Sequence, residues 1–110
     1  MAESEGGERE GRGVRLKAFE VEAIKTAARS AFGEDVVVRL FGSRVDDRSR
    51  GGDIDLHFET DKPIGDRDVT QFERTLFNAL DEQKVDKIFT VRGTELSPFE
   101  RICYRDGITL

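Results

Sequence analysis

Two stretches of the chain repeat their apolar residues at the interval of three to four that is typical of an amphipathic helix. The first covers residues 17–32 and is followed by Gly33, a residue type that commonly ends helices. The second covers residues 66–80. The apolar positions are Val21, Ile24, Ala28 and Ala31 in the first helix, and Val69, Phe72, Leu76, Phe77 and Leu80 in the second. Each helix is therefore expected to bury one face.

Three other stretches have the pattern of β-strands. Residues 36–41 form a β-branched run that ends at Gly42, and residues 84–91 form a similar run later in the chain. Between them, residues 53–59 (DIDLHFE) alternate strictly between apolar and polar side chains. One face of this strand holds Ile54, Leu56 and Phe58, and the other holds Asp53, Asp55, His57 and Glu59. We expect His57 to be a half-exposed strand residue rather than a metal ligand or a base.

A third helix near the end of the chain has a clear start signal. Ser97 is the expected N-cap, Pro98 the first helical position and Glu100 the second partner of a capping box. Gly107 should end this helix, and residues 108–110 could form a short closing strand.

The short connection between the first two strands favours antiparallel pairing, and the helix after the second strand permits a crossover. The predicted fold class is α/β (α+β), a small mixed β-sheet packed with helices.

Length and composition favour one small soluble domain. The chain has 110 residues, and its first 14 are rich in Gly and Glu with almost no apolar content. We predict that residues 1–14 form a disordered tail and that residues 15–110 form the domain. A core of this size is only marginally stable alone, so a partner or self-association to a homo-oligomer would stabilise it.

Charge and cysteine content narrow the function classes. The net charge of −5 argues against stable nucleic-acid binding, which normally uses a basic patch. No apolar run is long enough to span a membrane, and no leader segment is recognisable. The single cysteine, Cys103, excludes an internal disulfide and is expected to be a buried apolar residue. We therefore expect a cytoplasmic protein with no membrane partner.

Two carboxylates on one strand face are the first candidate for chemistry. Residues i and i+2 of a strand lie about 6–7 Å apart and project the same way, so Asp53 and Asp55 point toward one site. Mg²⁺ accepts one or two such carboxylates and completes its shell with water and substrate phosphates. Gly42 and Ser43, at the end of the preceding strand, offer backbone N–H groups and a hydroxyl to a phosphate. Taken separately, each feature is also compatible with an ordinary polar strand face or turn.

Together these residues resemble the DNA polymerase β-like nucleotidyltransferase superfamily, and more closely its minimal nucleotidyltransferase branch. The segments that carry the resemblance are RLFGSR, GGDIDLHFE, KVDKIFTV and PFERICYRDGITL. The similarity covers residues 16–110. It implies a polymerase β-like nucleotidyltransferase core for the whole domain.

The resemblance also implies roles for individual residues. Gly42 and Ser43 would hold the triphosphate of an incoming nucleotide. Asp53 and Asp55 would bind two Mg²⁺ ions. Asp86 would be the third carboxylate, ligating the catalytic metal and helping to deprotonate the acceptor hydroxyl. Such a site activates an attacking oxygen and neutralises charge on the leaving pyrophosphate.

The segment between Ser43 and Asp53 departs from the family pattern. It has nine residues, where the family usually has about ten. Asp46 and Asp47 stand where the family has a basic residue followed by Gly. Arg44 either contacts a phosphate or pairs with one of these acids at the surface. A module that neutralises its partner by contact, with a weakened active site, is therefore the alternative to an enzyme.

The molecule that accepts the transferred nucleotide is suggested only by the resemblance. Proteins similar to minimal nucleotidyltransferases are encoded in two-gene pairs. The second gene of such a pair encodes a small all-helical HEPN-type protein. In such toxin–antitoxin pairs the nucleotidyltransferase can act as the antitoxin, transferring AMP from ATP to a tyrosine of the toxin. An antibiotic-modifying oligomer is a less favoured reading. No base-reading element is identifiable in the sequence, so ATP is the expected substrate on the resemblance alone.

Overall fold

The computed structural model describes residues 16–41, 54–80 and 84–110, which form one small α+β unit. The predicted tail, residues 1–14, lies outside this part. The elements follow in the order α2 (Ala18–Phe32), β1 (Val37–Phe41), β2 (Ile54–Thr60), α3 (Asp66–Ala79), β3 (Val85–Val91), α4 (Pro98–Asp106) and β4 (Ile108–Thr109). Each agrees with a predicted helix or strand to within one or two residues. The described ranges contain no helix long and apolar enough to cross a membrane.

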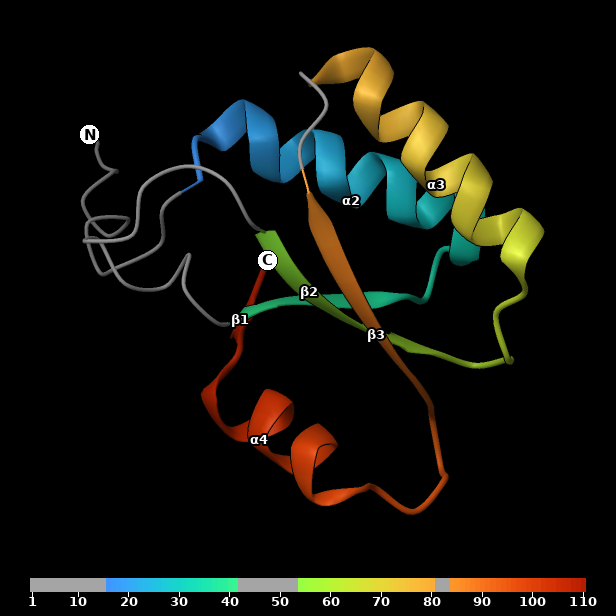
Figure 1. The fold of residues 1–110 in the computed structure, drawn as a ribbon, viewed down its shortest axis with the longest axis vertical. Helices are drawn as coiled ribbons and strands as arrows, with labels where there is room; N and C mark the ends of the chain where they lie inside the picture. The colour runs from blue at the N-terminus through green and yellow to red at the C-terminus, as the bar shows by residue number, and fades with distance from the viewer. Residues whose placement is uncertain (1–15, 42–53, 81–83) are drawn as a thin grey trace.

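The four strands form a single mixed sheet in the order β3-β2-β1-β4. Strand β1 is antiparallel to β2 and to β4, whereas β2 and β3 are parallel. Both predictions about strand direction are therefore confirmed. Helix α3 makes the crossover that parallel neighbours require. Helices α2 and α3 cover one face of the sheet and α4 covers the other (Figure 1).

The main hydrophobic core lies between the sheet and helices α2 and α3. The apolar residues of β2, including Phe58, are fully buried and point toward these helices. Phe58 contacts Phe32 of α2, Phe72 of α3 and Phe89 of β3, with ring centroids 5.1–5.2 Å apart. An aromatic pair of this kind stabilises by about 0.5–1.5 kcal/mol beyond the burial of its area. This cluster joins both helices to the centre of the sheet.

The other face of the sheet carries polar side chains that α4 covers. His57 is fully buried there, so the prediction that it is half-exposed is wrong. The strict alternation of β2 assigned His57 to the polar face, but only the packing of α4 decided that this face is covered. Cys103, on the inner side of α4, is also fully buried, which confirms its predicted apolar role.

Helix α4 begins with the predicted capping box. The Ser97 hydroxyl accepts a hydrogen bond from the Glu100 N–H at 3.2 Å, and the Glu100 Oε1 accepts one from the Ser97 N–H at 2.7 Å. The second Glu100 oxygen, Oε2, accepts a hydrogen bond from the Thr90 hydroxyl of β3 at 2.6 Å. The residue that caps the helix therefore also attaches it to the sheet.

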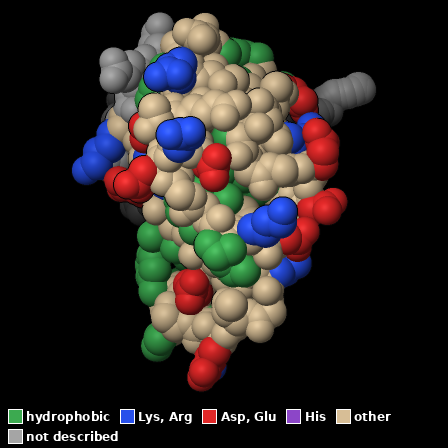
Figure 2. Space-filling model, turned by 90° about the vertical axis from the view of Figure 1, so that its right-hand side faces the viewer, with side chains coloured by type: hydrophobic (Ala, Val, Ile, Leu, Met, Phe, Trp, Pro, Cys, Tyr) green, Lys and Arg blue, Asp and Glu red, His purple; other side chains and the backbone are tan. Residues whose placement is uncertain are grey.

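Charged side chains of both signs intermingle on the face shown in Figure 2, and hydrophobic side chains gather below them. In the part of the chain that the structure describes, three large apolar side chains are strongly exposed: Phe19 on α2, and Phe99 and Ile102 on α4. Single exposed apolar residues are common on soluble proteins and need no explanation of their own. Phe99 and Ile102 are one helical turn apart, so they share one side of α4.

Candidate active site

The register of the sheet places two predicted site residues side by side. Asp55 of β2 pairs with Asp86 at the start of β3, and on its other side with Phe41, the last residue of β1. Paired residues on neighbouring strands project to the same face, and the strands lie about 4.8 Å apart. Both carboxylates therefore occupy the sheet face on which α4 packs. Asp86 is exposed and Asp55 is half-buried, so the pair is open to solvent on one side.

The parallel ladder that holds this pair starts just before it. The Ile54 N–H donates a hydrogen bond to the Lys84 carbonyl at 3.0 Å. Ile54 and Val85, which precede the two aspartates, are buried apolar residues that pair with each other. A shift of one residue in either strand would move an aspartate into the core and an apolar residue out of it. Burial of the neighbours thus determines the position of both carboxylates.

The remaining predicted site residues lie outside the described part of the chain. These are Gly42, Ser43, Arg44 and Asp53. Gly42 directly follows Phe41, and Asp53 directly precedes Ile54. The structure therefore brings Asp55 and Asp86 together, and the roles of the other four residues stay predictions from the sequence.

The donor chemistry of the pair fits Mg²⁺. Asp55 and Asp86 offer hard carboxylate oxygens, the ligand type that this ion prefers, and Mg²⁺ needs only one or two protein carboxylates. Within residues 16–41, 54–80 and 84–110, no group of three or more His, Cys, Asp or Glu side chains could hold a metal ion. Two of the three predicted ligands are described, and their arrangement is compatible with the predicted metal site.

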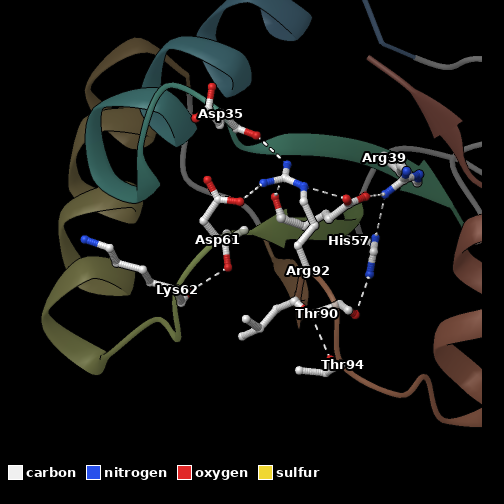
Figure 3. A network of polar contacts seen from close by, with 11 residues as sticks. Asp35, Arg39, His57, Asp61, Lys62, Thr90, Arg92 and Thr94 are labelled. Atoms are coloured by element: carbon white, nitrogen blue, oxygen red, sulfur yellow. Dashed lines mark hydrogen bonds and ion pairs between the residues drawn. The ribbon is translucent and has the colours of Figure 1, made fainter.

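A network of ion pairs holds the opposite end of the sheet together (Figure 3). Glu59 of β2 accepts from Arg39 of β1 at 3.0 Å and from Arg92, just after β3, at 2.7 Å. Arg92 also pairs with Asp61, beyond the end of β2. Burial by itself would raise the pKa of Glu59, but hydrogen bonds from Arg39, Arg92 and Tyr104 together hold that pKa below its usual range. Glu59 is thus a charged residue that joins three neighbouring strands.

His57 links this network to α4. Its Nε2 lies 2.9 Å from the Thr90 hydroxyl, and its Nδ1 lies 3.4 Å from the Arg39 guanidinium. The Thr90 hydroxyl proton is donated to Glu100, so Thr90 accepts from His57, and the ring carries its proton on Nε2. Burial, and then the Arg39 charge, lower the pKa of His57 and favour this neutral form.

The polar network was not predicted as a unit from the sequence. Its members are Arg39, His57, Glu59, Thr90, Arg92, Glu100 and Tyr104. The only sequence signal was the alternation that placed some of them on one strand face. Their role is structural: they position β2 and β3, the two strands that carry Asp55 and Asp86.

Replacing Thr90 by Val is expected to destabilise the protein by about 1–3 kcal/mol, because the buried His57 N–H and the Glu100 carboxylate both lose a partner. The free energy of unfolding in urea measures the change. Thr109→Val, on an exposed position of β4, is the matched control and should stay within about 0.5 kcal/mol of the wild type. Equal effects of the two substitutions would contradict the assigned role of Thr90.

Lowering the pH should reduce the free energy of unfolding, partly through protonation of Glu59. A carboxyl group whose pKa is lowered by folding stabilises the folded state above its unfolded pKa, near 4.5, and this contribution is lost as the pH falls through the folded pKa. We expect the unfolding free energy of the wild type to fall more steeply below about pH 4.5 than that of Glu59→Gln. Urea unfolding between pH 7 and pH 3 measures both slopes. If the unfolding free energies of the wild type and Glu59→Gln fall in parallel with pH, Glu59 does not contribute to the acid sensitivity.

No protein-family model matches the sequence, and no curated protein matches it. The argument for function therefore depends on the residues and their placement in the sheet.

Proposed function

We propose that this protein is a Mg²⁺-dependent nucleotidyltransferase of the minimal, polymerase β-like type, which transfers AMP from ATP to a hydroxyl group. The observation that supports this most strongly is the pairing of Asp55 with Asp86 across the parallel strands β2 and β3. The resemblance seen in the sequence requires the third carboxylate to lie beside the Asp-x-Asp strand. Helix α3 separates the two aspartates in the sequence, yet the sheet register makes them neighbours.

The exposed position of Asp86 suits the proposed role. An acceptor hydroxyl can approach this carboxylate from solvent and transfer its proton to a carboxylate oxygen. The acceptor oxygen then forms a bond to the α-phosphorus of ATP, the bond from that phosphorus to the bridging oxygen breaks, and pyrophosphate leaves. Asp55, half-buried beside Asp86, would hold Mg²⁺ together with Asp53. Bound Mg²⁺ would supply positive charge that stabilises the transferring and leaving phosphoryl groups.

The proposed acceptor is a small all-helical HEPN-type protein, with this chain as the antitoxin of a toxin–antitoxin pair. That part of the proposal depends on the sequence resemblance. The second candidate function is neutralisation of such a partner by contact alone. Asp46 and Asp47 in the nine-residue segment favour it, because acidic side chains repel a triphosphate.

Intact-mass analysis separates the two functions. The wild-type protein is mixed with a HEPN-type protein encoded beside it, ATP and Mg²⁺, and the Asp86→Asn variant is treated in parallel. A gain of one or more AMP units on the partner, absent with the variant, is the expected result. A stable complex with no mass gain from any of the four nucleoside triphosphates would instead support contact alone.

A further inference from the structure

An exposed aromatic ring lies next to Phe41, which pairs across the sheet with Asp55, one of the two candidate carboxylates. Phe99, in the first turn of α4, keeps 46% of its surface exposed. Its ring packs edge-on against Phe41, with centroids 5.7 Å apart and an angle of 73° between the planes. Phe41 is the strand partner of Asp55, which in turn pairs with Asp86. Phe99 is therefore separated from the Asp55 position by a single side chain.

The start of α4, which carries Phe99, is held in a defined place. Phe99 stands between Ser97 and Glu100, the two residues of the capping box, and Glu100 is hydrogen-bonded to Thr90 of the sheet. Phe41 packs against the ring in a T-shaped arrangement. A ring that is ordered before a ligand arrives loses little conformational entropy when the ligand binds.

Two other aromatic side chains, those of Tyr104 and Phe19, do not offer an equivalent surface near the aspartates. Tyr104 of α4 has its ring covered by the Arg39 guanidinium at 4.2 Å and stands edge-on to His57 at 5.0 Å. Phe19 is more exposed than Phe99, but it belongs to α2, which covers the opposite face of the sheet. Phe99 is thus the strongly exposed ring of the described residues that shares a face with Asp55 and Asp86.

The size of the apolar surface indicates a small planar occupant. Phe99 and Ile102 are the two strongly exposed large apolar residues of α4, at 46% and 42%. A stable protein interface buries about 800 Å² on each partner, far more than two side chains provide. A half-exposed aromatic ring and one aliphatic side chain match the size of a nucleobase. Stacking of a base on an aromatic ring is a common source of nucleotide affinity.

We propose that Phe99 is a base-binding residue, whose exposed ring stacks against the nucleobase of the nucleotide that has its phosphates at Asp55 and Asp86. This inference rests on the proposed function, and it adds the base-binding element that the sequence alone did not identify. Ile102, one turn further along α4, extends the apolar surface beneath the base. Stacking reads no hydrogen-bonding pattern, so Phe99 should strengthen binding of ATP and GTP alike.

The test compares the binding of ATP and of inorganic tripolyphosphate, which has no base, in the presence of Mg²⁺. Isothermal calorimetry measures both ligands with the wild type and with Phe99→Ala. We expect Phe99→Ala to weaken ATP binding about ten-fold, to leave tripolyphosphate binding unchanged, and to be rescued by Phe99→Trp. Phe99→Leu, which keeps apolar packing against Phe41, should also lose most of the ATP affinity. Phe19→Ala is the control and should bind both ligands like the wild type.

Each outcome has a distinct meaning. If the wild type binds neither ATP nor tripolyphosphate, the proposed function and this inference are both overturned. If the wild type binds ATP and Phe99→Ala binds it equally well, only the inference is overturned. If Phe99→Ala keeps its ATP affinity but loses the helical partner, Phe99 belongs to a protein interface and the base-binding role is wrong.

Discussion

Replacing Asp86 by Asn is expected to abolish nucleotidyl transfer while the protein stays folded. Asn has the shape of Asp without its charge, and Asp86 is exposed, so the substitution should change stability by no more than about 0.5 kcal/mol. Loss of a residue that only orients a metal ligand typically costs 10–100-fold, so loss of a proposed ligand and base should cost more than about 100-fold in rate. Transfer of radiolabelled AMP from ATP to the partner measures the rate.

Asp55→Asn should give a loss of similar size, since both carboxylates belong to the same pair. Asp66→Asn is the matched control, because Asp66 is an exposed aspartate in the first turn of α3, on the other side of the sheet. It should transfer AMP at the wild-type rate. Full activity in Asp86→Asn, with a confirmed fold, would rule out the proposed site.

Replacing Phe58 by Ala is expected to produce the largest loss of stability, about 3–5 kcal/mol. Phe58 is fully buried at the centre of β2 and contacts aromatic rings from α2, α3 and β3. Truncation leaves a cavity that these three elements could fill only by moving inward. The urea dependence of the far-ultraviolet circular dichroism measures the unfolding free energy.

Phe58→Leu keeps most of the buried volume, so it should lose clearly less stability and stay folded under conditions in which Phe58→Ala does not. Phe19→Ala removes the same atoms from a side chain that is 58% exposed, and it should change stability by no more than about 0.5 kcal/mol. A small effect of Phe58→Ala would contradict the assignment of the core.

The placement of Asp55 and Asp86 on neighbouring strands was partly predictable because both residues follow strand patterns. The alternation of residues 53–59 put Asp55 on the polar face, and the β-branched run over residues 84–91 put Asp86 at the start of a strand. Their pairing was implied only by resemblance to a family, and the register of β2 and β3 supports it. The polar network and the position of Phe99 were not predicted. Both depend on where α4 packs, and neither periodicity nor composition specifies that.

The sequence by itself determined the local elements: which residues form helices and strands, where α4 is capped, and which side of β2 is apolar. These follow from side-chain spacing and backbone preferences, which act over a few residues. Only the tertiary structure decided that α4 covers the polar face of the sheet and that His57 is buried and neutral. It also decided that Phe99 packs against Phe41, the strand partner of Asp55. Contacts between segments far apart in the chain decide these features, because the energy of each depends on what the other segment presents.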